Sequence, residues 1–100
     1  MKAECLQKKG DASGGLVLVN QIRPSAGVEP LAELTADNLL AERGRELFAE
    51  GHRRNDMIRF GKYFDARWEK PDVSDEHIKL WPIPTSQIQA NPNLIQNDGY

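Results

Sequence analysis

Three glutamates spaced four residues apart are the part of this sequence that most resembles an active site. Glu42, Glu46 and Glu50 would lie on one face of a helix, and His52 follows them closely. Two carboxylates on one helix face could act as a general acid and a general base, or could bind a metal ion together with a histidine. The spacing therefore raises acid–base catalysis and metal binding as hypotheses.

Four arginines among these glutamates favour a structural interpretation instead: Arg43, Arg45, Arg53 and Arg54. A guanidinium beside a carboxylate lowers the pKa of that carboxylate and holds it ionised, which makes it a poor general acid near neutral pH. We therefore predict an ion-pair lattice joining two helices, with bidentate pairing by Arg43 or Arg53. We predict no catalytic residue and no enzymatic activity.

The other residues that bind metals or activate nucleophiles are isolated from one another. His52 and His77 are solitary, Cys5 is the only cysteine, and neither a His-x-x-x-His nor a Cys-x-x-Cys motif occurs. Metal sites need several ligands at set spacings, and a phosphate loop needs a Lys-Ser/Thr pair that does not follow Gly14 and Gly15. We predict no metal site and no cofactor, and we interpret Cys5 as a small apolar residue on a helix.

A basic cluster with aromatic residues raises single-stranded nucleic acid as a further hypothesis. The cluster comprises Arg53, Arg54, Arg59, Phe60, Lys62 and Tyr63. Glu46, Glu50 and Asp56 lie among these residues, and the 100-residue chain carries a formal net charge of −2. The charge balance does not suit a polyanion, so we predict no nucleic-acid partner.

The elements that would position these residues begin with a helical hairpin over residues 1–27. The pattern predicts a first helix that ends near Lys9, with Gly10 as its stop, and a second helix over 12–25 capped by Asp11. An apolar stripe in the second helix comprises Leu16, Leu18, Val19 and Ile22. We expect Gly14 and Gly15 to allow a close approach by a neighbour.

A loop over 26–34 leads to a bent helix pair over residues 35–61. We predict a helix over 36–50 capped by Thr35, with an apolar face of Leu40, Leu47 and Phe48. Gly51 should end or bend this helix, and a shorter helix should run from His52 to about Phe60.

The last part of the chain is predicted to be less regular. Residues 62–79 form a surface loop anchored by Trp68, and Leu80–Pro84 is an extended segment because proline restricts its predecessor. Thr85 is predicted to cap a short helix over 86–90, and Trp81 to be packed within a docked tail over 80–100. The predicted fold is all-α, with no strand of useful length, in a single domain over 1–100.

Three blocks, in order, resemble the C-terminal end of the SusD/RagB family. The first runs from Gly10 to Gly27 and contains Val-Asn-Gln-Ile-Arg at 19–23. The second runs from Leu39 to Lys62 and contains Glu-Gly-His-Arg at 50–53 and Asp-Met-Ile-Arg at 56–59. The third runs from Leu80 to Tyr100 and begins Leu-Trp-Pro-Ile-Pro. Gly44 and Asn55 depart from the pattern, because the family usually has a charged residue at the first position and an aromatic core residue at the second.

The resemblance implies a tetratricopeptide-like hairpin and a non-enzymatic role in glycan or nutrient capture at the cell surface. SusD-like proteins are lipid-anchored in the outer membrane and act with a TonB-dependent transporter. We accordingly expect this chain to be the C-terminal fragment of a longer protein whose lipid anchor and glycan platform lie upstream. A stand-alone helical module that binds another protein, through the stripe that contains Val19, is the alternative.

No ligand-binding residue can be assigned from the resemblance, because the family's glycan platform is built mainly from parts upstream of this region. Sugars stack their apolar faces on exposed aromatic rings. Trp68 and Trp81 are therefore the first aromatic candidates, and Tyr63 and Tyr100 are the second.

Overall fold

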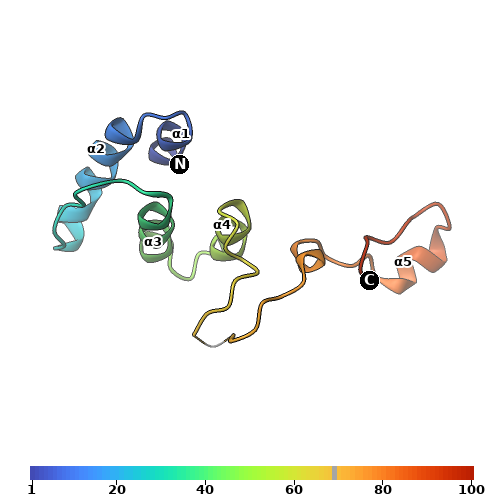
Figure 1. Ribbon diagram of the computed structural model, residues 1–100. Helices are drawn as coiled ribbons and strands as arrows, with labels where there is room; N and C mark the ends of the chain where they lie inside the picture. The colour runs from blue at the N-terminus through green and yellow to red at the C-terminus, as the bar shows by residue number, and fades with distance from the viewer. Residues whose placement is uncertain (69) are drawn as a thin grey trace. The chain divides into compact units, whose positions relative to one another are not determined.

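The computed structural model describes residues 1–68 and 70–100 and is all-α, as predicted (Figure 1). The chain divides into two compact units, Met1–Asp56 and Met57–Tyr100, which we describe separately. The helices, in chain order, are α1 (Lys2–Lys8), α2 (Ala12–Ile22), the 3-10 helix η1 (Arg23–Ala26), α3 (Ala36–Glu46), α4 (Arg53–Arg59), the 3-10 helix η2 (Glu76–Lys79) and α5 (Thr85–Ala90). None of the helices in the described residues is both long and apolar enough to cross a membrane.

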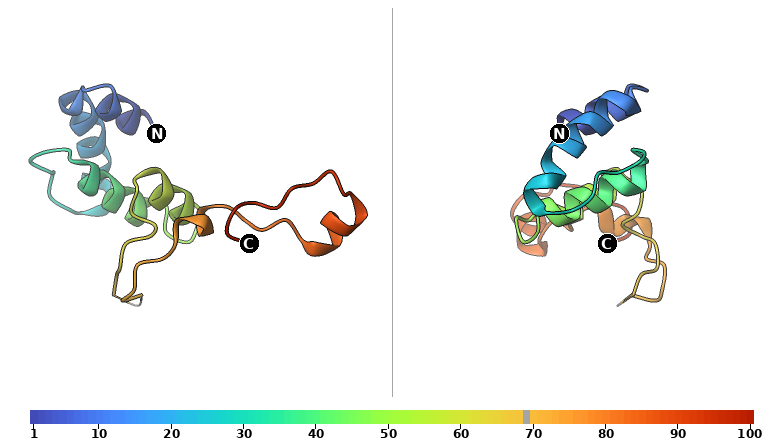
Figure 2. Two further views of the ribbon diagram at one scale, coloured as in Figure 1. Left: turned by 45° about the vertical axis from the view of Figure 1, so that its right-hand side comes forward. Right: turned by 90° about the vertical axis from the view of Figure 1, so that its left-hand side faces the viewer.

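The predicted hairpin is confirmed, with α1 and α2 packed side by side (Figure 2). Gly10 has φ 90° between the two helices, where it ends α1. The Asp11 carboxylate accepts the backbone N–H of Gly14 at 2.8 Å, so it caps α2 as the sequence indicated.

The close approach expected at the two glycines of α2 occurs at Gly15. A β-carbon at this position would lie 2.7 Å from Leu34 Cδ2 and 2.9 Å from the backbone oxygen of Ala3. Leu34 belongs to the apolar core, whose buried members in the described residues are Val19, Leu34, Leu39 and Leu40. Because Gly15 has no side chain, both α1 and Leu34 can approach the same face of α2 closely.

Helix α2 ends at Ile22, earlier than the predicted Ser25, and continues as η1. Pro24 lies in the first turn of η1 and has no N–H to donate, so the α-helical bonding cannot extend through it. The loop that follows is held by Asn20, whose amide nitrogen donates to Leu31 O at 3.0 Å and whose amide oxygen accepts Leu31 N–H at 2.8 Å.

Thr35 caps α3 as predicted, accepting the N–H of Asn38 at 3.1 Å, but the helix ends at Glu46 and not at Glu50. The backbone turns at Ala49 (φ 64°) and Gly51 (φ 76°) before α4 begins. This early end moves Phe48 off the helical face that it was predicted to share with Leu40, and its side chain is 83% exposed.

The second unit contains a loop of residues 63–68 and 70–75, η2 and the C-terminal tail. The Asp75 carboxylate accepts the backbone N–H of His77 at 3.1 Å and lies 3.1 Å from its Nδ1. These hydrogen bonds, the backbone one first, lower the pKa of Asp75. Trp68 was predicted to anchor the loop and is instead 93% exposed.

The tail folds back so that residues 96–100 bond to 80–83 (Figure 1). Gln96 accepts the N–H of Ile83 at 2.8 Å and donates to its carbonyl at 2.9 Å, and Tyr100 Oη donates to Leu80 O at 2.9 Å. Two predictions here were wrong. Thr85 is the first residue of α5 and gives no side-chain cap, and the Trp81 side chain is 72% exposed although Asn97 bonds its carbonyl.

The contact at Gly15 predicts that Gly15→Ala destabilises the chain by about 1–3 kcal/mol, because the added methyl must displace a backbone carbonyl as well as Leu34. Urea denaturation followed by circular dichroism measures the change. Val17→Ala is the control on the same helix, since Val17 is 58% exposed and should change stability by no more than about 0.5 kcal/mol. Equal effects from the two variants would contradict the tight packing of α1 on α2.

Candidate functional site

A buried charged cluster lies at the centre of the first unit, and Arg43 of α3 is its main cation. Arg43 Nε and Nη2 donate to Asp56 Oδ2 and Oδ1, each at 2.9 Å, which is a bidentate pair between α3 and α4. Glu4 of α1 places Oε2 at 3.9 Å from Arg43 Nε. Asp56 and Glu4 are only 3% and 4% exposed, so a single guanidinium connects two buried carboxylates from two other helices.

Glu42, next to Arg43, forms the second half of the cluster. Its Oε2 accepts from Arg23 Nη1 at 2.6 Å and from Arg45 Nη2 at 2.5 Å. The Arg23 side chain is only 12% exposed, whereas that of Arg45 is 59% exposed. This pairing connects α3 to η1, a contact that the sequence did not predict.

The charges of the cluster stabilise the packing of the helices and are not arranged for proton transfer. The pKa of Arg43 is raised, mainly by its hydrogen bonds to Asp56; burial opposes this, and the charges of Asp56 and Glu4 raise the pKa further. A guanidinium with a raised pKa stays charged at every physiological pH. Arg43 therefore neutralises buried carboxylates and cannot exchange a proton with a substrate.

The three glutamates that suggested catalysis do not come together. Glu42 is buried between arginines, whereas Glu46, Glu50 and His52 are exposed. Within residues 1–68 and 70–100, no three His, Cys, Asp or Glu side chains are grouped so that they could hold a metal ion. The predicted ion-pair lattice is present, but it uses Glu42 alone of the three, and Asp56 and Glu4 take the places expected for Glu46 and Glu50.

Arg53 pairs differently from the prediction. Its Nη1 donates to the backbone oxygen of Leu40 at 2.8 Å, and its guanidinium lies where a β-carbon on Gly44 would be, 2.7 Å away. Gly44, one of the two departures from the family pattern, is therefore what allows Arg53 to lie on α3. Asn55, the other departure, is exposed on α4 and not at the predicted core position.

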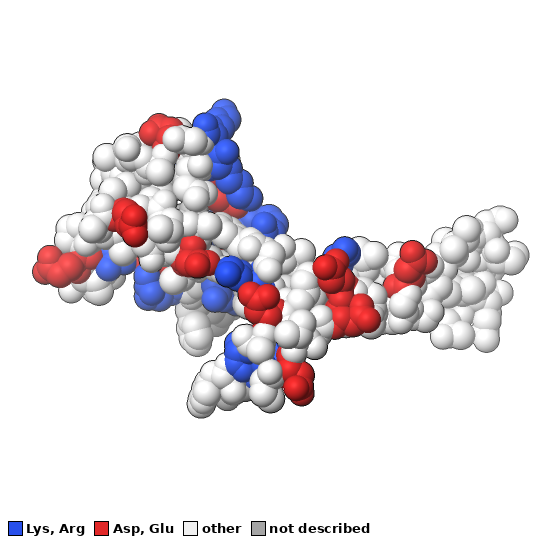
Figure 3. Space-filling view, in the orientation of Figure 1, with Lys and Arg blue, Asp and Glu red and all other residues white. Residues whose placement is uncertain are grey.

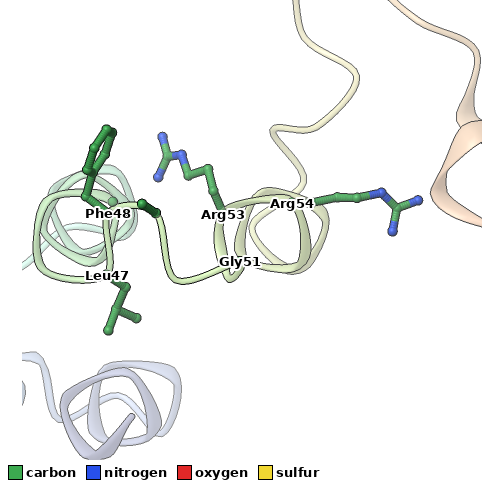
Figure 4. A pocket seen from close by; sticks show the side chains of 7 residues that line it. Leu47, Phe48, Gly51, Arg53 and Arg54 are labelled. Atoms are coloured by element: carbon green, nitrogen blue, oxygen red, sulfur yellow. The ribbon is translucent and has the colours of Figure 1, made fainter.

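An open hollow of about 590 Å³ lies beside Arg53 at the turn between α3 and α4 (Figure 4). Phe48 and Arg53 lie along one side of it, Leu47 points the opposite way from Phe48, and Arg54 points away from Arg53 (Figure 4). An exposed ring and a guanidinium can contact a flat ligand or a partner, but the lining offers no nucleophile or acid. Arg53 and Arg54 do not form the shared basic face that nucleic acid would need.

Exposed aromatic side chains are the remaining candidates for ligand contact. Trp68 and Trp81 are strongly exposed, and Tyr100 is 48% exposed with its ring at a 4.8 Å centroid distance from that of His77. Tyr63 packs edge-on against Phe64 at 5.7 Å. We assign no ligand-binding residue to these rings.

Residues 1–78 match the model of a protein family described as the SusD family. The chain is also 31% identical over 109 residues to the starch-binding protein SusD of Bacteroides thetaiotaomicron, a match that covers 99% of this chain and 19% of that protein. Two SusD-like proteins of Formosa agariphila, P38 and P25, are each 31% identical over 114 residues, covering 100% and 98% of this chain and 22% and 21% of those proteins. The chain thus spans about a fifth of the length of the curated relatives it matches.

The cluster predicts that Arg43→Met destabilises the chain by about 3–5 kcal/mol, because the substitution leaves Asp56 and Glu4 buried without their guanidinium. Arg45→Met is the matched control. Arg45 is exposed and Glu42 keeps Arg23, so the loss should stay within about 1 kcal/mol. Chemical denaturation of both variants tests the difference, and equal losses would argue against Arg43 as the central cation.

Proposed function

This chain belongs to the SusD family, and from that membership we propose that it is the C-terminal scaffold portion of a longer cell-surface protein that captures glycans or other nutrients. The observation that carries the proposal is the match, over 99% of this chain, to a protein named for starch binding. Because the chain spans about a fifth of that relative, we assign the binding of the nutrient mainly to parts outside these 100 residues.

The charged cluster supports a scaffold role without catalysis. The carboxylates of Glu42 and Asp56, which could have served as acids or bases, are buried against arginines. These ion pairs connect α3 to α1, α4 and η1. Such pairs fix geometry because a buried charge tolerates few arrangements. The first unit is therefore built to position its helices.

The tail supports an origin in a larger structure. Residues 80–97 contain no charged side chain, and the surface over α5 is accordingly white in Figure 3. Leu80, Trp81 and Ile95 on this segment are 46%, 72% and 87% exposed. Large apolar side chains that are exposed to this degree are candidates for contact with another surface. We propose that the tail docks on another part of the full-length protein.

We propose also that the full-length protein is lipid-anchored at the outer membrane, upstream of this chain, and works with a TonB-dependent transporter. The support is the family membership, since all three relatives carry the SusD name. The alternative, a stand-alone helical module, requires the α2 stripe to face a partner. Val19 of that stripe is buried within the first unit, whereas Ile22 is 46% exposed, so the stripe is only partly covered by the chain itself.

We expect an antibody against this chain to detect a protein far larger than 11.3 kDa in the outer-membrane fraction of the source cells. Fractionation followed by immunoblotting makes the measurement, with a resident inner-membrane protein as the control for fraction purity. A single soluble band near 11.3 kDa would overturn the assignment to a surface protein and would support the stand-alone module.

We expect the full-length protein to bind a starch-derived oligosaccharide or another glycan from a panel, and the isolated 100-residue chain to give no saturable binding. Isothermal titration of both proteins against the same panel tests this, after circular dichroism has shown that the isolated chain is helical. Equal affinity of the two would place the sugar site within this chain and contradict the scaffold assignment.

A further inference from the structure

The Lys70 loop, which we define as residues 63–68 and 70–75, is closed by backbone hydrogen bonds at two places. At its base, Ser74 N–H donates to Phe64 O at 3.0 Å. Nearer the tip, Arg67 N–H donates to Lys70 O at 2.7 Å, and Lys70 N–H donates to Arg67 O at 2.8 Å. Because the loop is irregular, its other backbone carbonyls need partners that a helix or a sheet would otherwise supply.

Lys70 supplies such a partner with its ammonium group. Its Nζ donates to the carbonyl oxygens of Asp72 at 2.7 Å, Phe64 at 3.0 Å and Asp65 at 3.4 Å. An ammonium has three N–H donors, so each of them can be directed at one of these carbonyls. The carbonyls come from both sides of the loop, and the ammonium therefore connects residues 64 and 65 to residue 72.

Apolar packing contributes to this loop at its base. The rings of Tyr63 and Phe64 pack edge-on there, with their centres 5.7 Å apart. Away from this pair, the side chains of Trp68 and Val73 are 93% and 73% exposed, whereas Lys70 is partly buried. Hydrogen bonds from a charged donor are stronger than those between neutral groups. We therefore attribute the order of the rest of the loop mainly to the ammonium of Lys70.

We propose that the carbonyl oxygens of Phe64, Asp65 and Asp72 form a site for a primary ammonium ion, which Lys70 fills with its own side chain. The charge and the N–H donors at this site hold the two sides of the loop together. Because the ammonium is tethered to the loop, its effective concentration at the site is high, and the loop stays ordered whatever ions are in solution. When the lysine side chain is shortened, the site takes a small organic ammonium ion from solution. The site is independent of what the full-length protein captures.

Hydrogen–deuterium exchange of the full-length protein, followed at the amides of Arg67 and Ser74, reports the opening of the loop. Lys70→Met keeps the length of the side chain and removes its N–H donors. We expect both amides to exchange faster by about tenfold or more, because a hydrogen bond to a charged group is worth about that factor. Lys70→Arg keeps a cation with N–H donors and should lose less protection than Lys70→Met.

Chemical rescue tests the ammonium site directly. Lys70→Ala removes the side chain beyond Cβ, and n-propylammonium reproduces the missing part. We expect n-propylammonium to slow the exchange of Lys70→Ala severalfold, whereas tetramethylammonium, which has the charge without an N–H donor, should not. Val73→Ala is the control, since it truncates an exposed side chain of the same loop and should change exchange by less than about twofold.

Exchange at the wild-type rate in Lys70→Met would overturn the site, and so would equal rescue of Lys70→Ala by tetramethylammonium. Absence of rescue by n-propylammonium would also overturn it, and would show that Lys70 acts only through its attached side chain. Equal slowing in the wild type, or at the Leu39 amide of α3, would reveal a general effect of the added salt and would overturn the site as well. The melting temperature of each variant should match that of the wild type, because the loop opens locally. A lower melting temperature in Lys70→Met would contradict a local site.

Discussion

The first unit depends on the neutralisation of buried carboxylates by arginine. Glu4, Glu42 and Asp56 are 4%, 5% and 3% exposed, and each would be prohibitively costly to bury alone as an ion. Arg43 meets two of them and Arg23 meets the third. Only four apolar residues of the described chain are buried to a similar degree, so the charged pairs form a large part of what is taken out of water. The placement of α1, α3 and α4 thus has to satisfy directional bonds as well as apolar contact.

This requirement explains a residue that looked unfavourable in the sequence. Gly44 costs α3 about 1 kcal/mol of helix propensity relative to alanine. The guanidinium of Arg53 occupies the space above it and donates to Leu40 O. A side chain at position 44 would require that guanidinium to shift, and Arg53 is the first residue of α4 after the turn. Gly44 therefore lowers the stability of α3 locally but leaves room for the hydrogen bond from Arg53 to Leu40 across the turn.

The sequence predicted the parts of the fold that depend on neighbouring residues. Asp11 and Thr35 are caps because a short oxygen-bearing side chain before a helix needs only the first turn to bond to. It could not select Asp56 over Glu46 as the partner of Arg43, because both are within reach along a helical pattern and only the packing of α4 decides which is buried. Trp81 was predicted to pack because it lies between Leu80 and Pro82, and Trp68 was predicted to anchor its loop. Both side chains are exposed, because neighbours in the sequence do not determine exposure where polar groups hold the segment in place. The charged cluster was predicted least well, because its ion pairs depend on how helices pack and the spacing of residues along the chain does not give that packing.

The second unit shows how a segment can be ordered without burying its largest side chains. Lys70 bonds three carbonyls of its loop, and Gln96 bonds both backbone groups of Ile83. These bonds satisfy backbone groups that would otherwise need a sheet or a helix, so they hold an irregular chain in one conformation. Because they lie close to water, each contributes little to stability, about 0.5–1.5 kcal/mol. Apolar contact with another surface would stabilise this unit further. The exposed indoles of Trp68 and Trp81 leave a large apolar surface in this unit for such a contact.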